Sequence, residues 1–340
     1  MVMKKILVIL STLLIEILSV NANENTNVLS PVVLEDGAAY SVESTLIEKQ
    51  PEAHKDLYNL EVIDINTVNY LFKDKLTKQF SEESAWKDVH LWGAYNGDWS
   101  MIFKEEGSTR NHYEFNALSL GSDWQLKDNN GDFRFMVNFS PLSHRNMLRN
   151  TICDVYAGTN KIPHHRVQVG HFRPGVGMEG KMSSYLFPFL TRSQISRNFS
   201  AVRKVGGRVT GDYSLVDYDI GVFSSDTYFK SFFPGAEVDA WVNVKPLGKT
   251  SGKYGDLKLG GGIQNGHRDH DYTVIGTYAE YDYKKLMLNF EWANADGYNG
   301  ILGHANTQAA GFYTTIGYRV TQKLQLLARY DEYDPNKDIK

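Results

Sequence analysis

The heptapeptide LMLNFEW, Leu286 to Trp292, carries a large apolar side chain at every second position. The segment before it, 272–282, alternates in the same way, with Glu280 and Asp282 on its polar face. A period of two predicts β-strands that have one apolar face and one polar face. In a soluble sandwich the apolar face points into the core, whereas in a membrane barrel it points outward to lipid and the polar face lines water.

The composition of the chain favours the barrel. Its 340 residues include 20 Tyr, 17 Phe and 6 Trp, yet the mean hydropathy is polar, at -0.39. A barrel produces this combination because its apolar band uses only alternate residues. The net charge of -4, without a basic stripe, argues against a nucleic-acid partner. The single cysteine, Cys153, excludes an intrachain disulfide, and we interpret it as a small apolar residue on a strand.

The N-terminus is typical of a secretory signal peptide. Lys4 and Lys5 precede the mostly apolar run 6–14, and Ala22 ends a small-residue cleavage site. The apolar run is too short for a transmembrane helix, and no later stretch approaches the length that a helix needs to cross a bilayer. The sequence therefore predicts an exported protein from which residues 1–22 are removed.

Residues 23–88 differ from the rest of the chain. They are rich in Glu, Asn, Lys and Ser, and apolar residues recur at helical spacing over 65–80. We interpret 23–88 as an N-terminal periplasmic extension, partly helical or disordered, with a helical protein-contact element as the alternative. Residues 89–340 are predicted to form the transmembrane β-barrel.

Alternation and turn residues predict thirteen strands after residue 89. They are 92–104, 111–126, 131–140, 150–158, 164–172, 204–212, 216–224, 236–245, 255–264, 272–282, 285–294, 307–319 and 322–333. Most of their connections alternate between short and long, and only 246–254 and 265–271 break this order. Sorting of loops by length is typical of a membrane barrel, which has turns on the periplasmic side and loops outside.

The number of predicted strands bears on the end of the chain. Single-chain bacterial barrels have an even number of strands, and an open edge in lipid leaves backbone groups unpaired. We therefore expect that the sequence is a C-terminal truncation that lacks one to three strands.

The longest predicted connection is 173–203, RPGVGMEGKMSSYLFPFLTRSQISRNFSAVR. Its one acid, Glu179, stands against five basic residues: Arg173, Lys181, Arg192, Arg197 and Arg203. It also holds four aromatic residues, which a surface loop in water does not need. These features predict a loop that folds into the barrel and forms a basic constriction in contact with anions. The alternative is an outside loop that packs on its neighbours or on lipopolysaccharide.

The predicted lumen wall carries charges of both signs. Alternation places these bases inward: Arg134, Arg166, Lys258, Arg319 and Arg329. It also places these acids inward: Asp217, Asp219, Asp239, Glu280, Asp282, Glu291 and Asp331. A mixed, slightly acidic wall suits a water-filled pore, so any anion preference must come from the loop.

The run His267-Arg268-Asp269-His270 is the strongest hint of an enzyme. Two histidines and an aspartate can ligate zinc on a suitable turn, or serve a hydrolase at the outer face of a barrel. However, further partners at a suitable spacing are lacking, as are a Gly-x-Ser-x-Gly motif, a Walker loop and paired cysteines. We expect no catalytic residue, metal or cofactor. A barrel hydrolase and a structural barrel that uses 23–88 to contact periplasmic partners remain alternatives.

Several short motifs carry a family resemblance. The run 169–174 (VGHFRP), then Gly177-Met178-Glu179, Ser183-Ser184, Phe189 and Arg192-Ser193, resembles the signature of the phosphate-selective porin O and P family. Residues 206–212 and 217–222 are similar to the next hairpin of that family, and the resemblance covers roughly 90–333.

The resemblance implies an outer-membrane barrel of about 16 strands, usually trimeric, with an inward loop and with Arg192 on the constriction. Thr191 stands where the family commonly has an acidic residue, and Met182 stands where it usually has a threonine. These departures weaken the expectation of a preference for phosphate. The sequence thus predicts an outer-membrane porin of a Gram-negative-type bacterium, either general or weakly anion-preferring, for passive diffusion of small hydrophilic solutes or ions. The expected partners are lipid, lipopolysaccharide, solutes and two further copies of the chain.

Overall fold

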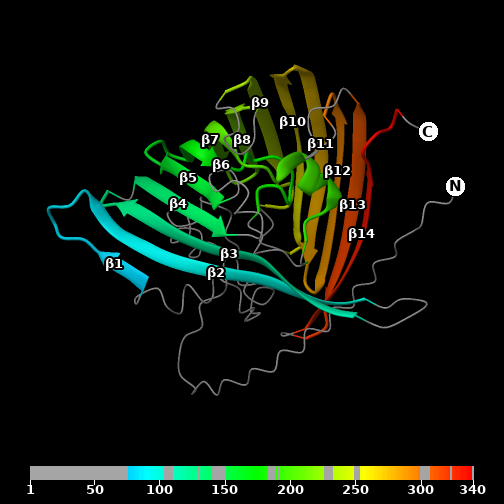
Figure 1. Ribbon diagram of the computed structural model, residues 1–340, viewed down its shortest axis with the longest axis horizontal. Helices are drawn as coiled ribbons and strands as arrows, with labels where there is room; N and C mark the ends of the chain where they lie inside the picture. Colours follow the sequence, from blue (N-terminus) through cyan, green and yellow to red (C-terminus); the bar gives the residue numbers. More distant parts are fainter. Residues whose placement is uncertain are drawn as a thin grey trace.

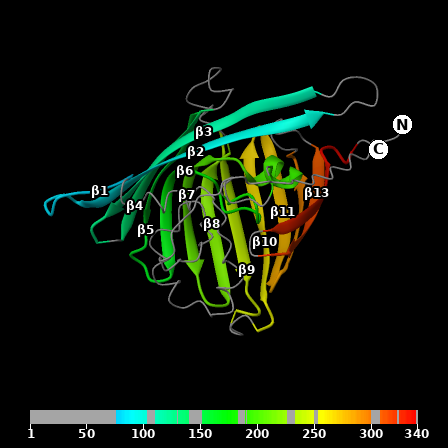
Figure 2. The same ribbon diagram turned by 90° about the horizontal axis from the view of Figure 1, so that it is seen from below.

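The computed structural model describes residues 76–102, 110–128, 130–139, 151–182, 189, 191–225, 233–248, 253–298, 307–321 and 324–338. These residues form one sheet of 14 strands, in which every strand pairs with its neighbours in chain order. All of the pairings are antiparallel. The sheet is strongly curled, so that one face is concave (Figures 1 and 2). The predicted all-β, antiparallel fold is therefore confirmed.

The strands have the following bounds. They are β1 (Thr77–Gln79), β2 (Trp86–Ile102), β3 (Arg110–Leu126), β4 (Gly131–Phe139), β5 (Ile152–Thr159), β6 (His165–Phe172), β7 (Lys204–Asp212), β8 (Val216–Ser224), β9 (Ala236–Val244), β10 (Asp256–Arg268), β11 (His270–Tyr283), β12 (Leu286–Asp296), β13 (Gln308–Arg319) and β14 (Gln325–Asp334).

The first strands differ from the prediction. Residues 77–79 form β1 instead of the end of a helix, so the helix predicted over 65–80 is wrong there, and its residues before 76 lie outside the described residues. The pairing of Thr77 with His90 explains the difference, because β2 starts at Trp86 and gives β1 a partner, with Thr77 Oγ1 2.9 Å from His90 Nδ1. The described residues thus form 14 strands instead of the predicted thirteen, and pairing begins before the predicted domain boundary at residue 89.

Burial across the sheet is the reverse of that in a soluble protein. In β9, the apolar Val238 and Val242 are 48% and 47% exposed, whereas the charged Glu237 and Asp239 are 1% and 2% exposed. The same contrast recurs along the sheet: large apolar side chains from β2 to β14 are exposed on the convex face, which we call the outer face. Polar and charged side chains are buried on the concave face. This arrangement needs an apolar environment around the sheet.

The strands are long enough to cross a bilayer. A tilted transmembrane β-strand needs about 9–11 residues, and the strands from β7 to β14 have 9 to 14 residues. Among the residues described above, no helix is long and apolar enough to cross a membrane.

The antiparallel order sorts the connections between the two ends of the strands. One end, which we call the turn end, carries 80–85, 127–130, 160–164, 213–215, 245–255, 284–285 and 320–324. The other end, the loop end, carries 103–109, 140–151, 173–203, 225–235, Asp269 and 297–307. Most connections at the loop end are the longer ones. The exceptions are the two that break the predicted alternation, namely 245–255 and the tight turn at Asp269.

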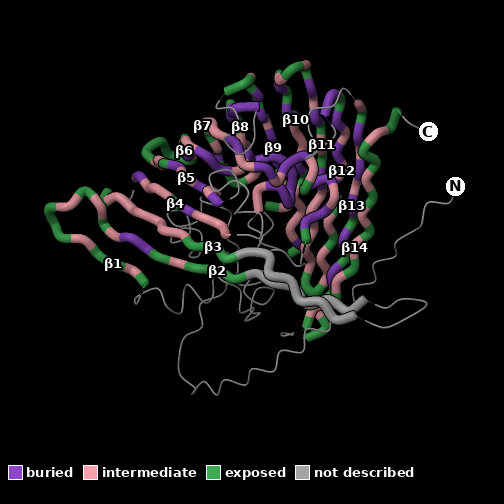
Figure 3. Tube along the Cα trace, in the orientation of Figure 1, coloured by how far each residue is buried: buried purple, intermediate pink, exposed green. Residues whose placement is uncertain are grey.

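The largest apolar core lies on the concave face between β9–β13 and the segment 173–203. Trp241, Tyr272, Tyr278 and Tyr313 contribute from the strands to this buried cluster. In Figure 3 the buried stretches gather in this part of the sheet. The largest core thus forms where the segment 173–203 covers the sheet, and a smaller buried cluster joins Tyr156, Phe172 and Phe223.

A positive charge in the middle of the outer face tests whether that face contacts lipid. Ile220 lies midway along β8 and is 46% exposed, and Val216 lies on the same face at the end of the strand and is 37% exposed. In lipid, Ile220→Arg should lower the free energy of unfolding by about 2–4 kcal/mol and Val216→Arg by about 0–1 kcal/mol. Denaturant titration of vesicle-inserted protein measures both changes. Equal, small effects would contradict a lipid-facing surface.

Candidate functional site

The segment 173–203, which we call the inward loop, connects β6 to β7 and folds back over the concave face. Its short π-helical turn, η2 (Ser196–Ser200), lies beside β11–β13 (Figure 1). Phe199 packs there between Tyr298 and Tyr333, with ring centroids 6.1 Å and 5.7 Å away. Ile195 is buried in the same apolar cluster. The predicted inward fold of this loop is therefore confirmed.

Three carboxylates bind backbone amides of the inward loop. Glu291 of β12 accepts a hydrogen bond from the Met178 amide at 3.0 Å, and Asp331 of β14 accepts one from the Gln194 amide at 2.8 Å. Within the loop, Glu179 accepts one from the Ser193 amide at 2.7 Å. Buried backbone groups need such partners, so the wall acids fix the path of the loop.

Glu179 also joins the loop to the last strand. Its carboxylate forms an ion pair with Arg329 of β14, and both side chains are almost fully buried. Arg329 donates a further hydrogen bond to the Thr191 carbonyl at 3.1 Å. Its guanidinium lies over the rings of Phe189 and Tyr313, at 4.1 Å and 5.1 Å. We call the Glu179–Arg329 pair the latch, because it fastens the loop at a second point on the wall.

Gly177 permits the close approach of the loop to β12. Its φ of +71° is unfavourable for other residues, and a Cβ at this position would lie 2.3 Å from Glu291 Oε1. The Tyr313 hydroxyl donates to the other oxygen of Glu291 at 2.8 Å. Both carboxylate oxygens of Glu291 thus accept hydrogen bonds, one from the loop and one from the neighbouring strand.

Three of the five basic loop residues bond to other parts of the loop or to the wall. Arg173 donates to the Met182 carbonyl at 3.0 Å, and Arg192 donates to the carbonyls of Glu179 and Met182. Arg203 pairs with Asp154 of β5 at 2.5 Å. Their predicted contact with anions stays a prediction, but these guanidinium groups already have partners in the protein.

The remaining two basic residues differ in their surroundings. Arg197 is exposed and donates to the neutral side chain of Gln194 at 2.8 Å. Lys181 is half-buried and lies close enough to Asp217 for an electrostatic interaction. Arg197 is therefore the exposed one among the five basic loop residues.

The bases predicted for the lumen wall lie next to acids. Arg134 pairs with Asp123 at 2.5 Å, Arg166 with Asp132 at 2.6 Å and Lys258 with Asp217 at 3.4 Å. Arg319 interacts electrostatically with Asp282, and Arg329 belongs to the latch. The first three pairs join neighbouring or nearby strands, so charges of the wall compensate one another within the protein.

Two further ion pairs on the concave face were not predicted. Lys204 binds both carboxylate oxygens of Glu237, which also accepts a hydrogen bond from the hydroxyl of Tyr272. Arg208 pairs with Asp219 at 2.8 Å. Lys204, Arg208 and Thr210 are separated by even numbers of residues on β7, so their side chains share one face of the strand. The period of two would therefore have placed both bases on the inward face.

The histidine cluster of the β10–β11 turn does not assemble as a hydrolase would need. His267 contacts Asp271 at 2.7 Å instead of Asp269, and both side chains are exposed. His270 lies 2.8 Å from the Gly297 carbonyl through its Nε2. The part of the chain that the structure describes contains no group of three or more metal-ligating side chains.

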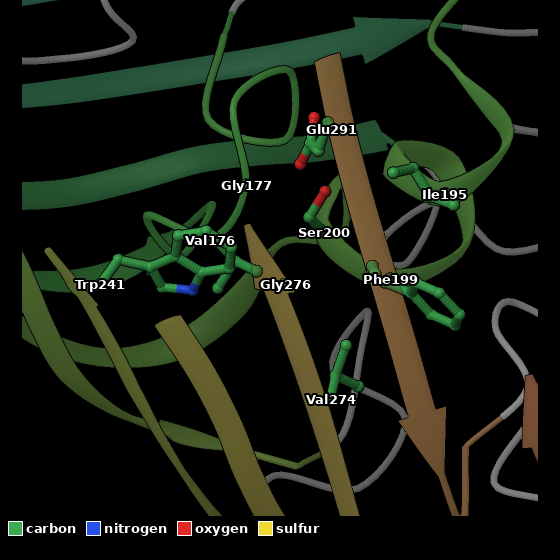
Figure 4. A pocket seen from close by; sticks show the side chains of 10 residues that line it. Val176, Gly177, Ile195, Phe199, Ser200, Trp241, Val274, Gly276 and Glu291 are labelled. Carbon is green, nitrogen blue, oxygen red and sulfur yellow. The ribbon is translucent and has the colours of Figure 1, made fainter. Parts of the chain in front are cut away.

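A small cavity remains between the inward loop and the strands β9, β11 and β12 (Figure 4). Val176 and Phe199 line it from the loop, and Trp241, Val274 and Glu291 line it from the sheet. It has room for about one water molecule. It is therefore a packing gap and not a path for a solute.

Comparisons with known proteins give only distant likenesses. No family model and no curated protein match the chain. Among solved structures, the anion-selective porin from Comamonas acidovorans has a TM-score of 0.39 and 11% identity, over 71% of this chain and 87% of that one.

Two other solved structures are similar to the chain at the same level. OccK2 (OpdF) of Pseudomonas aeruginosa in complex with glucuronate has a TM-score of 0.34 and 9% identity, over 71% of this chain and 77% of that one. OmpF of Salmonella typhi in complex with daunomycin has a TM-score of 0.34 and 12% identity, over 73% and 91%. Likenesses of this size do not assign the chain to a family.

Limited proteolysis tests the latch. Loss of one partner of a buried ion pair costs about 3–5 kcal/mol, so Glu179→Ala should release the loop and speed tryptic cleavage after Arg192 and Arg197 at least tenfold. Asp123→Asn removes an ion pair elsewhere on the concave face and serves as the matched control. Equal cleavage rates in the two variants would show that the latch does not hold the loop.

Proposed function

We propose that the chain forms an outer-membrane pore through which small hydrophilic solutes or ions diffuse passively. The observation that carries this proposal is the reversed burial of the sheet, with exposed apolar side chains outside and charged side chains on the concave face. Lipid covers such an outer face, and water fills such an interior. Closure of the sheet into a complete barrel is part of the proposal.

The inward loop is the proposed constriction of this pore. It lies against the concave face of β9–β14 and is fixed by Glu291, Asp331 and the latch. A loop fixed at several points narrows the lumen to a constant width. Pore width, instead of a substrate-binding pocket, then sets the size limit for solutes.

The charge distribution supports at most a weak preference for anions. The paired bases of the wall contribute little net field, so the exposed Arg197, whose hydrogen-bond partner Gln194 is neutral, matters most. A phosphate preference, which the family resemblance implies, would require more arginines that face the solute. Diffusion through such a pore needs neither a catalytic residue nor a cofactor.

The same proposal implies a cellular location and an orientation in the membrane. The predicted signal peptide 1–22 lies outside the described residues and would direct export. The turn end would face the periplasm, and the loop end would face outward, toward lipopolysaccharide. A homotrimer is the assembly that the family resemblance implies.

Planar-bilayer recording tests the pore directly. The full-length protein should produce stepwise, ohmic current increments whose size rises with salt concentration, because ions would cross a water-filled lumen. Glu179→Ala, which frees the loop, should change the unit conductance. Folded protein that inserts but gives no current would contradict the proposal.

Reversal potentials test which charges set selectivity. A unit charge about 6 Å from an ion in water contributes ~0.7 kcal/mol, or roughly a threefold change in permeability ratio. Lys181→Gln combined with Arg197→Gln should therefore shift the anion-to-cation ratio toward cations by several-fold. Lys337→Gln, at the exposed loop end, is the control that removes a positive charge away from the inward loop. An unchanged reversal potential in the double variant would remove these residues from selectivity.

A further inference from the structure

Lysines lie over aromatic rings at three separate places of the turn end. The ammonium of Lys78 is 5.7 Å from the centre of the Phe80 ring, that of Lys253 is 5.1 Å from Tyr254, and that of Lys284 is 4.9 Å from Tyr283. These contacts come from connections far apart in the sequence. Their recurrence at one end indicates a shared environment.

The rings of the turn end lie next to the outer face. Tyr281 and Tyr283 alternate with the inward Glu280 and Asp282, and their rings stack at 6.4 Å. The Tyr281 hydroxyl donates to the Tyr254 carbonyl at 2.9 Å, which joins the end of β11 to the connection 245–255. Aromatic side chains with one apolar and one polar part favour the boundary between hydrocarbon and water.

A second aromatic group occupies the same end. The ring of Tyr213 stacks on His164 at 5.2 Å and contacts His165 at 5.9 Å, and Tyr218 contacts His165 at 6.0 Å. Ile162, in the adjacent turn, is exposed. Aromatic side chains at the turn end therefore extend from the β5–β6 turn to the β11–β12 turn.

Exposed charges differ in sign between the two ends of the strands. Among the described residues, the turn end carries Lys78, Lys87, Lys127, Lys161, Lys253, Lys284 and Lys285, against Glu82, Glu83, Asp128 and Asp212. The loop end carries Lys337 and, on the inward loop, Arg197, against Asp269, Asp271, Asp296, Asp334 and Asp338. One of the acids at the turn end, Asp212, already pairs with Lys245 at 2.9 Å. The turn end is thus basic, whereas the loop end is acidic.

We propose that the turn end binds the headgroups of anionic phospholipids. The lysines would contact the lipid phosphates while the rings beside them lie at the hydrocarbon boundary, so that charge and apolar surface match the two layers of one leaflet. This inference rests on the proposed membrane span. It also assigns the direction of insertion. The turn end lies in the leaflet whose negative charge is carried by phospholipids.

Spin-labelled lipids measure this preference on the full chain in phosphatidylcholine vesicles. The wild-type protein should retain labelled phosphatidylglycerol several-fold more than labelled phosphatidylcholine. Each lysine near the headgroups can contribute up to roughly a fivefold increase in this retention ratio. Added salt should reduce the ratio, because it screens the charges. The triple variant Lys161→Gln, Lys253→Gln and Lys284→Gln should lower the ratio to about one. The variant with arginine at the same three positions keeps the charge and should retain the preference.

The matched control changes cations at the opposite end. Arg268→Gln combined with Lys337→Gln should leave the phosphatidylglycerol preference intact. An unchanged ratio in the triple glutamine variant, or selective retention of lipopolysaccharide or peptidoglycan fragments in place of phosphatidylglycerol, would overturn the inference. Insertion without any lipid preference would overturn it while leaving the pore proposal standing, whereas failure to insert at all would overturn both.

Discussion

The backbone amides of the inward loop leave water when the loop packs on the sheet, and their need for hydrogen-bond acceptors governs the rest of the site. Glu291 and Asp331 supply acceptors from the wall, and Glu179 supplies one from the loop itself. A carboxylate on a buried face is costly without partners. The loop and the wall therefore stabilise each other, because each provides the groups that the other would leave unsatisfied.

The same constraint explains the ion pairs of the concave face. Pairs such as Arg134 with Asp123, and Lys204 with Glu237, neutralise buried charge between strands. They have the role that apolar contacts have in a soluble core, while the apolar side chains of the same strands point outward. A sheet built in this way depends on a nonpolar surrounding for its outer face and on water or protein for its inner face.

Much of the fold could be predicted from the sequence because a period of two is a local signal. Alternation placed the strand around Leu286–Trp292 and gave the two faces of the sheet. It missed β1, since Thr77–Gln79 is too short to show a period and depends on its pairing with β2. It also identified the basic loop, but residue type alone did not show that Arg192 binds carbonyl groups whereas Arg197 is exposed. Those roles depend on the three-dimensional path of the loop, which no spacing encodes.

The strands pair in the order in which they follow one another, so the sheet can grow by adding one hairpin at a time. The latch does not fit this local order, because Glu179 and Arg329 are 150 residues apart. Arg329 lies on β14, which ends the order of the described strands. The latch therefore cannot form until β14 has joined the sheet, whereas Glu291 of β12 can hold the loop earlier. During assembly the loop can thus pack on β9–β12 first, and its second attachment point follows only with β14.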